Sequence, residues 1–549
     1  MDIVALRRSR WIFWIAACLL VVLAALGGIG WLVARRAEPW LHDCVVAGLE
    51  QRFKARVELD GFHVWFSDGL WAEGRGLRIW PADGVEGASA EGNPLIRLDI
   101  FRFHAPLRYE PGKTIHISTV HLKGLTLDLP PKNRFAHLNV AQKVPTQTDS
   151  LATPLAAVRF QVDSIECQSA HVTLETSKPG KLPLQAEIAS LHLKLNDDGS
   201  MNFAAELTNP RPVGRIHTTG VFGRWQIPDP GETSVSGQYN FDHADLSTFR
   251  GIAGILNSTG QYKGTLRDLA VDGETHVPDF RLTHFGTPLR LDTHFHALVD
   301  ATSGDTRLQS VDAMLGRSRL RASGQIVRVL VSNQSIGRDI NLHVSVENGR
   351  IEDFLRLTSR SGTPLMTGAF TMETAFDLPP GNDPLHERLK LNGTFALDQV
   401  LFTSDKIQSK IGELSSRGQG HPDQAKSAAA SDIRSDLHGH FILVSGVMNL
   451  PDLQYTVPGA EVALKGTYGV EGGALDFAGI AKLDATISHV VGGWKGMLLK
   501  PFDGYFKRDG SGTSVPIHIR GTREAPDFGV DLNHFKHGAQ HGADPAAIH

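Results

Sequence analysis

Residues 289–299 read LRLDTHFHALV, and this stretch indicates the fold class most clearly. Apolar or neutral residues occupy the odd positions, while Arg290, Asp292, His294 and His296 occupy even positions. Successive side chains of a β-strand point to opposite faces, so this alternation predicts a strand with one apolar face and one wet face.

The same period of two recurs along much of the chain. Leu342, Val344 and Val346 repeat it, as do residues 57–66 near the start of the pattern. Residues 120–129 change parity at Gly124, where a glycine could form a β-bulge. Turn residues separate the runs and long helical crossovers are nearly absent, which predicts antiparallel strands joined by hairpins.

Composition bounds the function. The 549 residues are 41% hydrophobic, and the net charge of −4 argues against a nucleic-acid-binding protein, which usually carries a basic stripe. The three cysteines are too few for a disulfide framework. Cys44 and Cys167 are expected to be free thiols, with a bond between them as the alternative.

Residues 11–34 form an uncharged run, WIFWIAACLLVVLAALGGIGWLVA. The run is long enough to cross a bilayer as a helix and has tryptophans near both ends, which predicts a transmembrane anchor. A cleaved signal peptide is the alternative, but its apolar region is usually shorter. Three arginines precede the span and two follow it, which favours a cytoplasmic N-terminus.

Helical spacing of Leu41, Val45, Leu49 and Phe53 predicts a short amphipathic helix after the anchor, covering a sheet edge or lying on the membrane. Residues 143–154 are expected to form a polar loop. The expected organisation is a cytoplasmic segment 1–10, the anchor 11–34, the helix 38–54, a β-repeat region 55–414, a flexible polar insertion 415–436, a C-terminal β region 437–533 and a disordered tail 534–549.

Two segments share the pattern G-x4-P-D-F: GETHVPDF at 273–280 and GTREAPDF at 521–528. Each lies between apolar runs. We interpret them as a repeated turn that joins like strands, which suggests stacked repeats rather than one closed core.

Two longer segments resemble a known family. Residues 223–282 run from GRWQIPDP to GETHVPDFRL, and the segment from Ala481 contains GGWKGMLLKPFDGYF and GTREAPDFGVDL. Both resemble the AsmA-like proteins of Gram-negative bacteria, within the superfamily that includes the TamB-like proteins. The resemblance covers most of the chain, and its motifs are Gly/Pro/Asp turn patterns.

This family is similar to bridge-like lipid-transfer proteins. The resemblance implies a curled, half-pipe-like antiparallel sheet whose apolar groove carries phospholipid between the inner and outer membranes, without cofactor or catalytic residues. The residues alone leave two solutions open, because a one-faced sheet must pack on a second sheet or curl around a ligand.

Two sets of candidate site residues follow. The apolar strand faces would line the groove, with plain core packing as the alternative: Leu289, Leu291, Phe295, Leu342, Val344 and Val346. A short apolar stretch with basic borders could touch an anionic membrane surface, with packing on the last strands as the alternative: Trp494, Lys495, Met497, Leu498 and Lys500.

Enzyme and metal motifs are missing from the sequence. It has no H-E-x-x-H, C-x-x-C, G-x-S-x-G or P-loop pattern, and the paired histidines His294/His296 and His438/His440 fit a wet strand face. We therefore expect a non-enzymatic, single-pass inner-membrane protein whose bulk lies in the periplasm and transports phospholipid. The alternatives are a scaffold or assembly factor for outer-membrane proteins, or a hydrolase with an unrecognised site.

Overall fold

Strands dominate the structure, a computed structural model, because the period-two segments bury one face and expose the other. It describes residues 39, 42–43, 45–50, 55–80, 94–106, 115–129, 160–175, 181, 183–226, 229–249, 251–283, 287–332, 335–358, 363–381, 383–421, 433–485, 513–523 and 525–530.

The first half of the sheet contains β1 (Val57–Phe66), β2 (Leu70–Ile79), β3 (Ile96–Ala105), β4 (Ile115–Leu129), β5 (Phe160–Leu174), β6 (Leu184–Leu195), β7 (Met201–Pro210), β8 (Val213–Phe222), β9 (Ser234–Asp245), β10 (Ile252–Ala253), β11 (Ile255–Thr265) and β12 (Leu269–Leu282). The second half contains β13 (Leu289–Asp300), β14 (Asp305–Leu315), β15 (Ser318–Ser332), β16 (Ser335–Arg350), β17 (Met366–Leu378), β18 (Lys390–Phe402), β19 (Ser435–Val444), β20 (Val447–Val457), β21 (Ala460–Gly469), β22 (Ala474–Leu483), β23 (Thr513–Thr522) and β24 (Pro526–Val530).

Neighbours in the chain are neighbours in the sheet. Apart from the two-residue β10, which pairs with β12, the strands form one ladder in chain order from β1 to β24. β18 pairs directly with β19, so the two β regions expected at 55–414 and 437–533 form one sheet.

One pair departs from the expected antiparallel pattern. β4 and β5 are parallel, whereas all other described pairs are antiparallel. For two consecutive strands to be parallel, the chain must cross back to the end of the sheet at which the first strand began, and only a long connection can do so. Residues 130–159 provide it, and the polar stretch predicted as a loop at 143–154 falls in this connection, outside the described residues.

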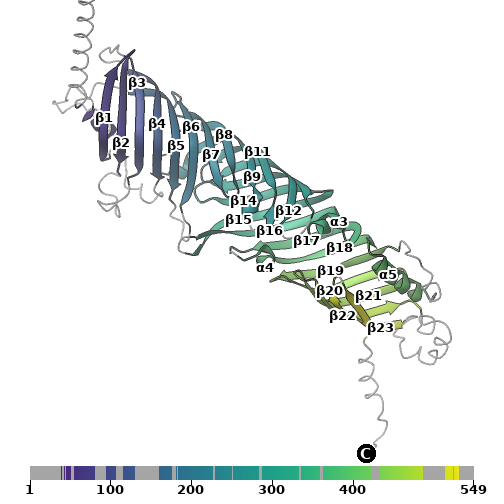
Figure 1. The fold of residues 1–549 in the computed structure, drawn as a ribbon. Helices are drawn as coiled ribbons and strands as arrows, with labels where there is room; N and C mark the ends of the chain where they lie inside the picture. Colours follow the sequence, from purple (N-terminus) through teal and green to yellow (C-terminus); the bar gives the residue numbers. More distant parts are fainter. Residues whose placement is uncertain are drawn as a thin grey trace, which may run out of the picture.

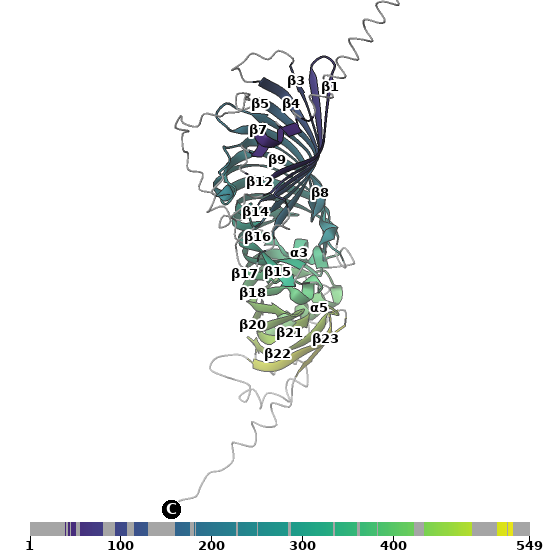
Figure 2. The same ribbon diagram turned by 90° about the vertical axis from the view of Figure 1, so that its left-hand side faces the viewer.

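The sheet is elongated and curled. The strands lie across the long axis, from β1 at the purple end to β23 at the yellow end (Figure 1). The turned view shows the curl, with α3 (Ile351–Thr358) and α5 (Asp405–Gly418) against one side (Figure 2). The expected mainly β fold with a half-pipe shape is confirmed.

The helices α3 and α5 both follow strands that run in the same direction. β16 and β18 run the same way in the antiparallel ladder, so α3 and α5 lie on the same rim, while α4 (Leu385–Arg388) lies on the other. The short 3-10 helices η2 (Pro230–Glu232) and η3 (Leu246–Thr248) flank β9.

The start predicted for the polar insertion, residue 415, is wrong. Residues 415–418 form the last turn of α5, and Ser415 is buried with its hydroxyl donating to the Pro458 carbonyl at 2.7 Å. The apolar face of the helix, which includes Ile411, explains the extension, because it packs on β20–β22. Residues 422–432 lie outside the described part of the chain.

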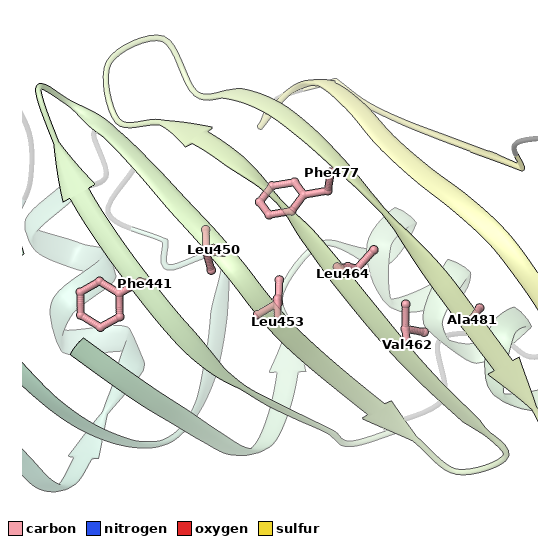
Figure 3. Close-up of a cluster of buried hydrophobic side chains, with 7 residues drawn as sticks. All are labelled: Phe441, Leu450, Leu453, Val462, Leu464, Phe477 and Ala481. Carbon is pink, nitrogen blue, oxygen red and sulfur yellow. The ribbon is translucent and has the colours of Figure 1, made fainter. Parts of the chain in front are cut away.

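Apolar side chains gather on one face of the sheet. A cluster at the C-terminal end combines Phe441, Leu450, Leu453, Val462, Leu464, Phe477 and Ala481, all on one side of β19–β22 (Figure 3). At the other end, Val45, Val46 and Leu49 of helical residues 45–50 pack against a cluster from β1–β3. Helical segments therefore cover parts of this face near both ends.

The parity change predicted at Gly124 is present, but it is not a β-bulge, because the β3–β4 register is the same on both sides of it. Gly124 has φ +69° and no register partner, and Leu122 and Leu125 on its two sides both pack against the same cluster. A side chain at this position would start 2.1 Å from the Asp99 carboxylate, so glycine is required.

The prediction of a repeated G-x4-P-D-F turn is wrong. Residues 521–528 do form the β23–β24 turn, but residues 273–280 lie inside β12 and produce a register shift between Val277 and Phe280. Pro278 has no N–H to donate to the ladder, and the Asp279 carboxylate instead accepts the Ile255 backbone N–H at 2.9 Å. One sequence pattern thus occurs in two conformations.

Several predicted segments fall outside the described residues: the anchor 11–34, the stretch 490–500 and the tail 534–549. In the part of the chain that the structure describes, no helix is long and apolar enough to cross a membrane. Cys44 also lies outside, whereas Cys167 is a buried free thiol on β5.

Candidate functional site

One row of residues crosses the whole sheet on its apolar face, with one residue on each strand of the ladder. We call it the midline row. From β1 to β24 it comprises Phe62, Gly74, Phe101, Leu122, Cys167, Leu191, Ala205, Thr218, Tyr239, Gly260, Gly273, Phe295, Val311, Ala322, Val344, Thr374, Gly393, Phe441, Leu450, Gly466, Phe477, Ile519 and Phe528.

The midline row contains no charged residue. Successive members are direct register partners, except that a bulge in β19–β20 separates Phe441 from Leu450, which pack in one cluster. The curl of the sheet makes this row the floor of a groove, in which members such as Phe101, Cys167 and Phe441 are buried by protein. A surface of this kind can hold long apolar chains but offers few groups for acid–base chemistry.

The predicted lining residues share this apolar face. Phe295 and Val344 belong to the midline row, and Leu342 lies in the adjacent row. Leu289 and Leu291 lie on the same face of β13, opposite Phe280 and Val277 of β12.

Val346 has different surroundings. It is 2% exposed and clusters with Phe370, Leu397 and Val400, against which Phe354 of α3 packs. The backbone N–H of Thr287, just before β13, donates to the Arg356 carbonyl of α3 at 2.9 Å. α3 therefore spans from β16–β17 to β13 and converts this part of the groove into a closed core.

Glycines beside aromatic rings shape the floor. A Cβ on Gly74 would lie 2.1 Å from the Phe101 ring, and a Cβ on Gly273 would lie 2.7 Å from the Phe295 ring and 2.3 Å from Tyr239 Oη. The rings thus lie over neighbouring strands instead of standing upright. This arrangement keeps the floor low where an upright aromatic side chain would fill the groove.

Hydroxyl groups interrupt the apolar surface on β8–β13. Tyr239 Oη lies 3.2 Å from Ser258 Oγ, and Tyr262 Oη lies 2.5 Å from Thr218 Oγ1. Burial raises the pKa of both tyrosines, with the hydrogen bonds opposing the shift. These hydroxyls bond to one another, so the middle of the groove is neutral at physiological pH.

The opposite face carries ion pairs between histidines and carboxylates. Its histidines pair with carboxylates across strands, as in His296–Asp272 at 2.6 Å and His343–Glu373 at 3.0 Å. A shallow depression of about 690 Å3 over β8–β13 is lined mostly by such polar side chains, including His217 and Glu274. No group of three metal-ligating side chains occurs within the described ranges.

The two rims of the groove meet where the β5–β6 connection reaches the β13–β14 turn. β5 and β13 run in opposite directions, so the β5–β6 connection and the β13–β14 turn belong to opposite rims. Lys181, just before β6, lies 2.8 Å from the Asp305 carboxylate at the start of β14 and donates to the Arg328 carbonyl of β15. The Lys181 side chain is only 13% exposed, so this contact, which we call the seam, is a packed junction.

Sequence reasoning missed the seam. Lys181 and Asp305 are 124 positions apart, and neither belongs to a recognisable motif. Only the curl of the sheet brings them together, so no local signal could have found them.

The membrane-surface candidates Trp494, Lys495, Met497, Leu498 and Lys500 lie outside the described residues, and their role stays a prediction. Compared with protein-family models, curated proteins and solved structures, the chain shows no match. The functional argument therefore rests on the groove itself.

Proposed function

We propose that this protein is a membrane-anchored periplasmic carrier that binds phospholipid by its acyl chains and helps transport it between the envelope membranes. The observation that carries this proposal is the uncharged midline row, which runs along the sheet from β1 to β24. The proposed activity is non-enzymatic and needs no cofactor.

The energetics favour a lipid occupant. Transferring a methylene group from water to an apolar surface contributes about 0.8 kcal/mol, so a groove of this kind gains most from long alkyl chains. Strands spaced roughly 4.8 Å apart give the floor a path on the order of 100 Å along the sheet. An acyl chain spans about half of a bilayer core of roughly 30 Å, or about three strand spacings, so several lipids could be held in file.

The proposal places the protein in the inner membrane. Residues 11–34 would form the single span, with residues 1–10 in the cytoplasm and the sheet in the periplasm. The helical residues 45–50 pack at the β1–β3 end of the groove, so this end would lie nearest the inner membrane.

An assembly or scaffold role is the second candidate. Among the described strands, β24 pairs only with β23, so its outer edge presents unpaired backbone groups. An edge of this kind can accept a strand from another protein, as an outer-membrane protein client would provide.

Site-specific photo-crosslinking distinguishes these functions. A photoreactive residue replaces Leu342 or Phe295 on the apolar face, and matched versions replace their polar-face neighbours Asn341 or His294, all in the full-length protein within membranes. Phospholipid adducts from the apolar positions alone would support lipid transport. Protein adducts without lipid adducts at the apolar positions would support the assembly role and contradict the proposal.

A further inference from the structure

The seam gathers more positive charge than its contacts neutralise. Arg328 on β15 and Arg338 on β16 are direct cross-strand partners on the apolar face, in line with Ile326 and Ile340. Like charges directly opposite each other destabilise a sheet. An arginine pair at the end of an apolar face therefore requires an explanation.

The Arg328 side chain already donates hydrogen bonds to backbone carbonyls at the seam. Its Nη1 donates to the Ser303 carbonyl at 2.9 Å and its Nη2 to the Pro183 carbonyl at 3.5 Å. Its backbone N–H donates to the Asp305 carboxylate at 2.9 Å, the same carboxylate that pairs with Lys181. Asp305 thus accepts from the backbone and from Lys181, and within the described residues no arginine side chain donates to it.

Arg338 and Arg211 complete the cluster. Arg211 lies in the β7–β8 turn, on the rim that also carries the β5–β6 connection. Desolvation and the neighbouring charges of Arg328 and Arg211 lower the pKa of Arg338, in agreement with the direct cross-strand pairing of Arg328 and Arg338. Within the described part of the chain, neither Arg338 nor Arg211 forms an ion pair with a carboxylate.

We infer that the seam is a phosphate-binding site, formed by Arg211, Arg328 and Arg338, for the headgroup of a phospholipid whose acyl chains lie in the groove. Guanidinium groups bind phosphate oxygens through paired, charge-assisted hydrogen bonds. A phosphate anion would relieve the repulsion between the arginines, and the apolar rows that continue from Ile326 and Ile340 would receive the chains. This inference rests on the proposed function and adds a preference for phosphorylated lipids.

The test compares two lipids that differ only in phosphate. Phosphatidic acid and diacylglycerol with identical acyl chains are titrated, in detergent micelles, against the full-length protein, the double variant Arg211→Gln/Arg338→Gln and the control Arg307→Gln. Arg307 lies on β14 near the same rim but on the opposite, exposed face. The side chains of Arg211 and Arg338 make no hydrogen bond within the described structure, so the fold of the double variant is expected to persist.

We expect the wild type and the control to prefer phosphatidic acid by about ten- to hundredfold, and the double variant to bind both lipids alike. A double variant that keeps the preference would overturn the inference while leaving lipid binding intact. If neither lipid binds to any form, the proposed function fails instead. In that case, the melting temperature is measured with added inorganic phosphate. A melting temperature that rises in the wild type but not in the double variant would support a site for free phosphate, and an unchanged melting temperature in both would overturn the phosphate site.

Discussion

A single carboxylate placed in the groove should separate lipid binding from folding. Val344 on β16 is half-buried in the midline row, between Ala322 and Thr374 of the adjacent strands. Its neighbour Ser345 points to the polar face, between Arg321 and Glu373, whose opposite charges balance. Val344→Glu and Ser345→Glu therefore add the same charge to the two faces of one strand.

The magnitude follows from the acyl contact that is lost. A glutamate at 344 can stay hydrated in an open groove, and its water shell would displace about four methylenes of a bound chain. At about 0.8 kcal/mol each, the loss is ~3 kcal/mol, or roughly a hundredfold in lipid affinity. Ser345→Glu should leave the affinity within about twofold, because that face never contacts the lipid.

The assay is binding and vesicle-to-vesicle transfer of a fluorescent phospholipid, with circular dichroism as the control for folding. We expect Val344→Glu to fold normally and to lose binding and transfer together. If the apolar face were a closed core, the buried carboxylate would instead unfold the strands around β16. Unfolding of Val344→Glu, or equal lipid binding by both variants, would refute the reasoning.

Three further predictions concern the fold. Gly124→Ala should weaken hydrogen-exchange protection of β3 and β4 by about 1–2 kcal/mol because of the positive φ, whereas Gly61→Ala, where a Cβ meets nothing within 4 Å, should cost less than 1 kcal/mol. Equal effects would contradict the need for a positive φ at Gly124. Asp353→Ala should loosen α3 by about 2–3 kcal/mol in the same measurement, because the Arg317 backbone N–H loses its acceptor and the buried Ser318 hydroxyl keeps only the more distant Arg350 carbonyl at 3.3 Å. Adding Ser318→Ala should recover part of the loss, and full additivity would show that the bond between Ser318 and Asp353 is unimportant. Burial raises the pKa of Tyr455 to about 12, whereas the pKa in the unfolded chain is about 10. The stability that the neutral phenol contributes is therefore complete below pH 10 and is lost as the pH rises from about 10 to about 12. Tyrosinate absorbance should show one fewer late-titrating tyrosine in Tyr455→Phe than in the wild type, and identical titrations would contradict the burial of Tyr455.

The strands and their faces were predictable from sequence because a strand's burial is a local property. The alternation from Leu289 to Val299 identified β13 and its apolar side, and the parity change at Gly124 was also visible, although the expected bulge is absent because the register does not shift there. The candidates Leu342 and Val344 were found in the same way.

Features that depend on how distant strands meet were not predictable. GETHVPDF and GTREAPDF look alike, yet one bulges inside β12 because Asp279 binds β11, while the other turns at the sheet's end. Nothing in the sequence around Val346 indicates that α3 covers it. The Lys181–Asp305 seam depends on the curl accumulated over many strands, which no local pattern encodes.

Native mass spectrometry of the full-length protein, extracted gently from membranes and released from its detergent in the instrument, tests the central claim most directly. An open apolar groove predicts at least one phospholipid bound to each molecule, and loss of that lipid in Val344→Glu but not in Ser345→Glu. A protein that is consistently empty, or lipid retained equally by both variants, would contradict a lipid-binding groove.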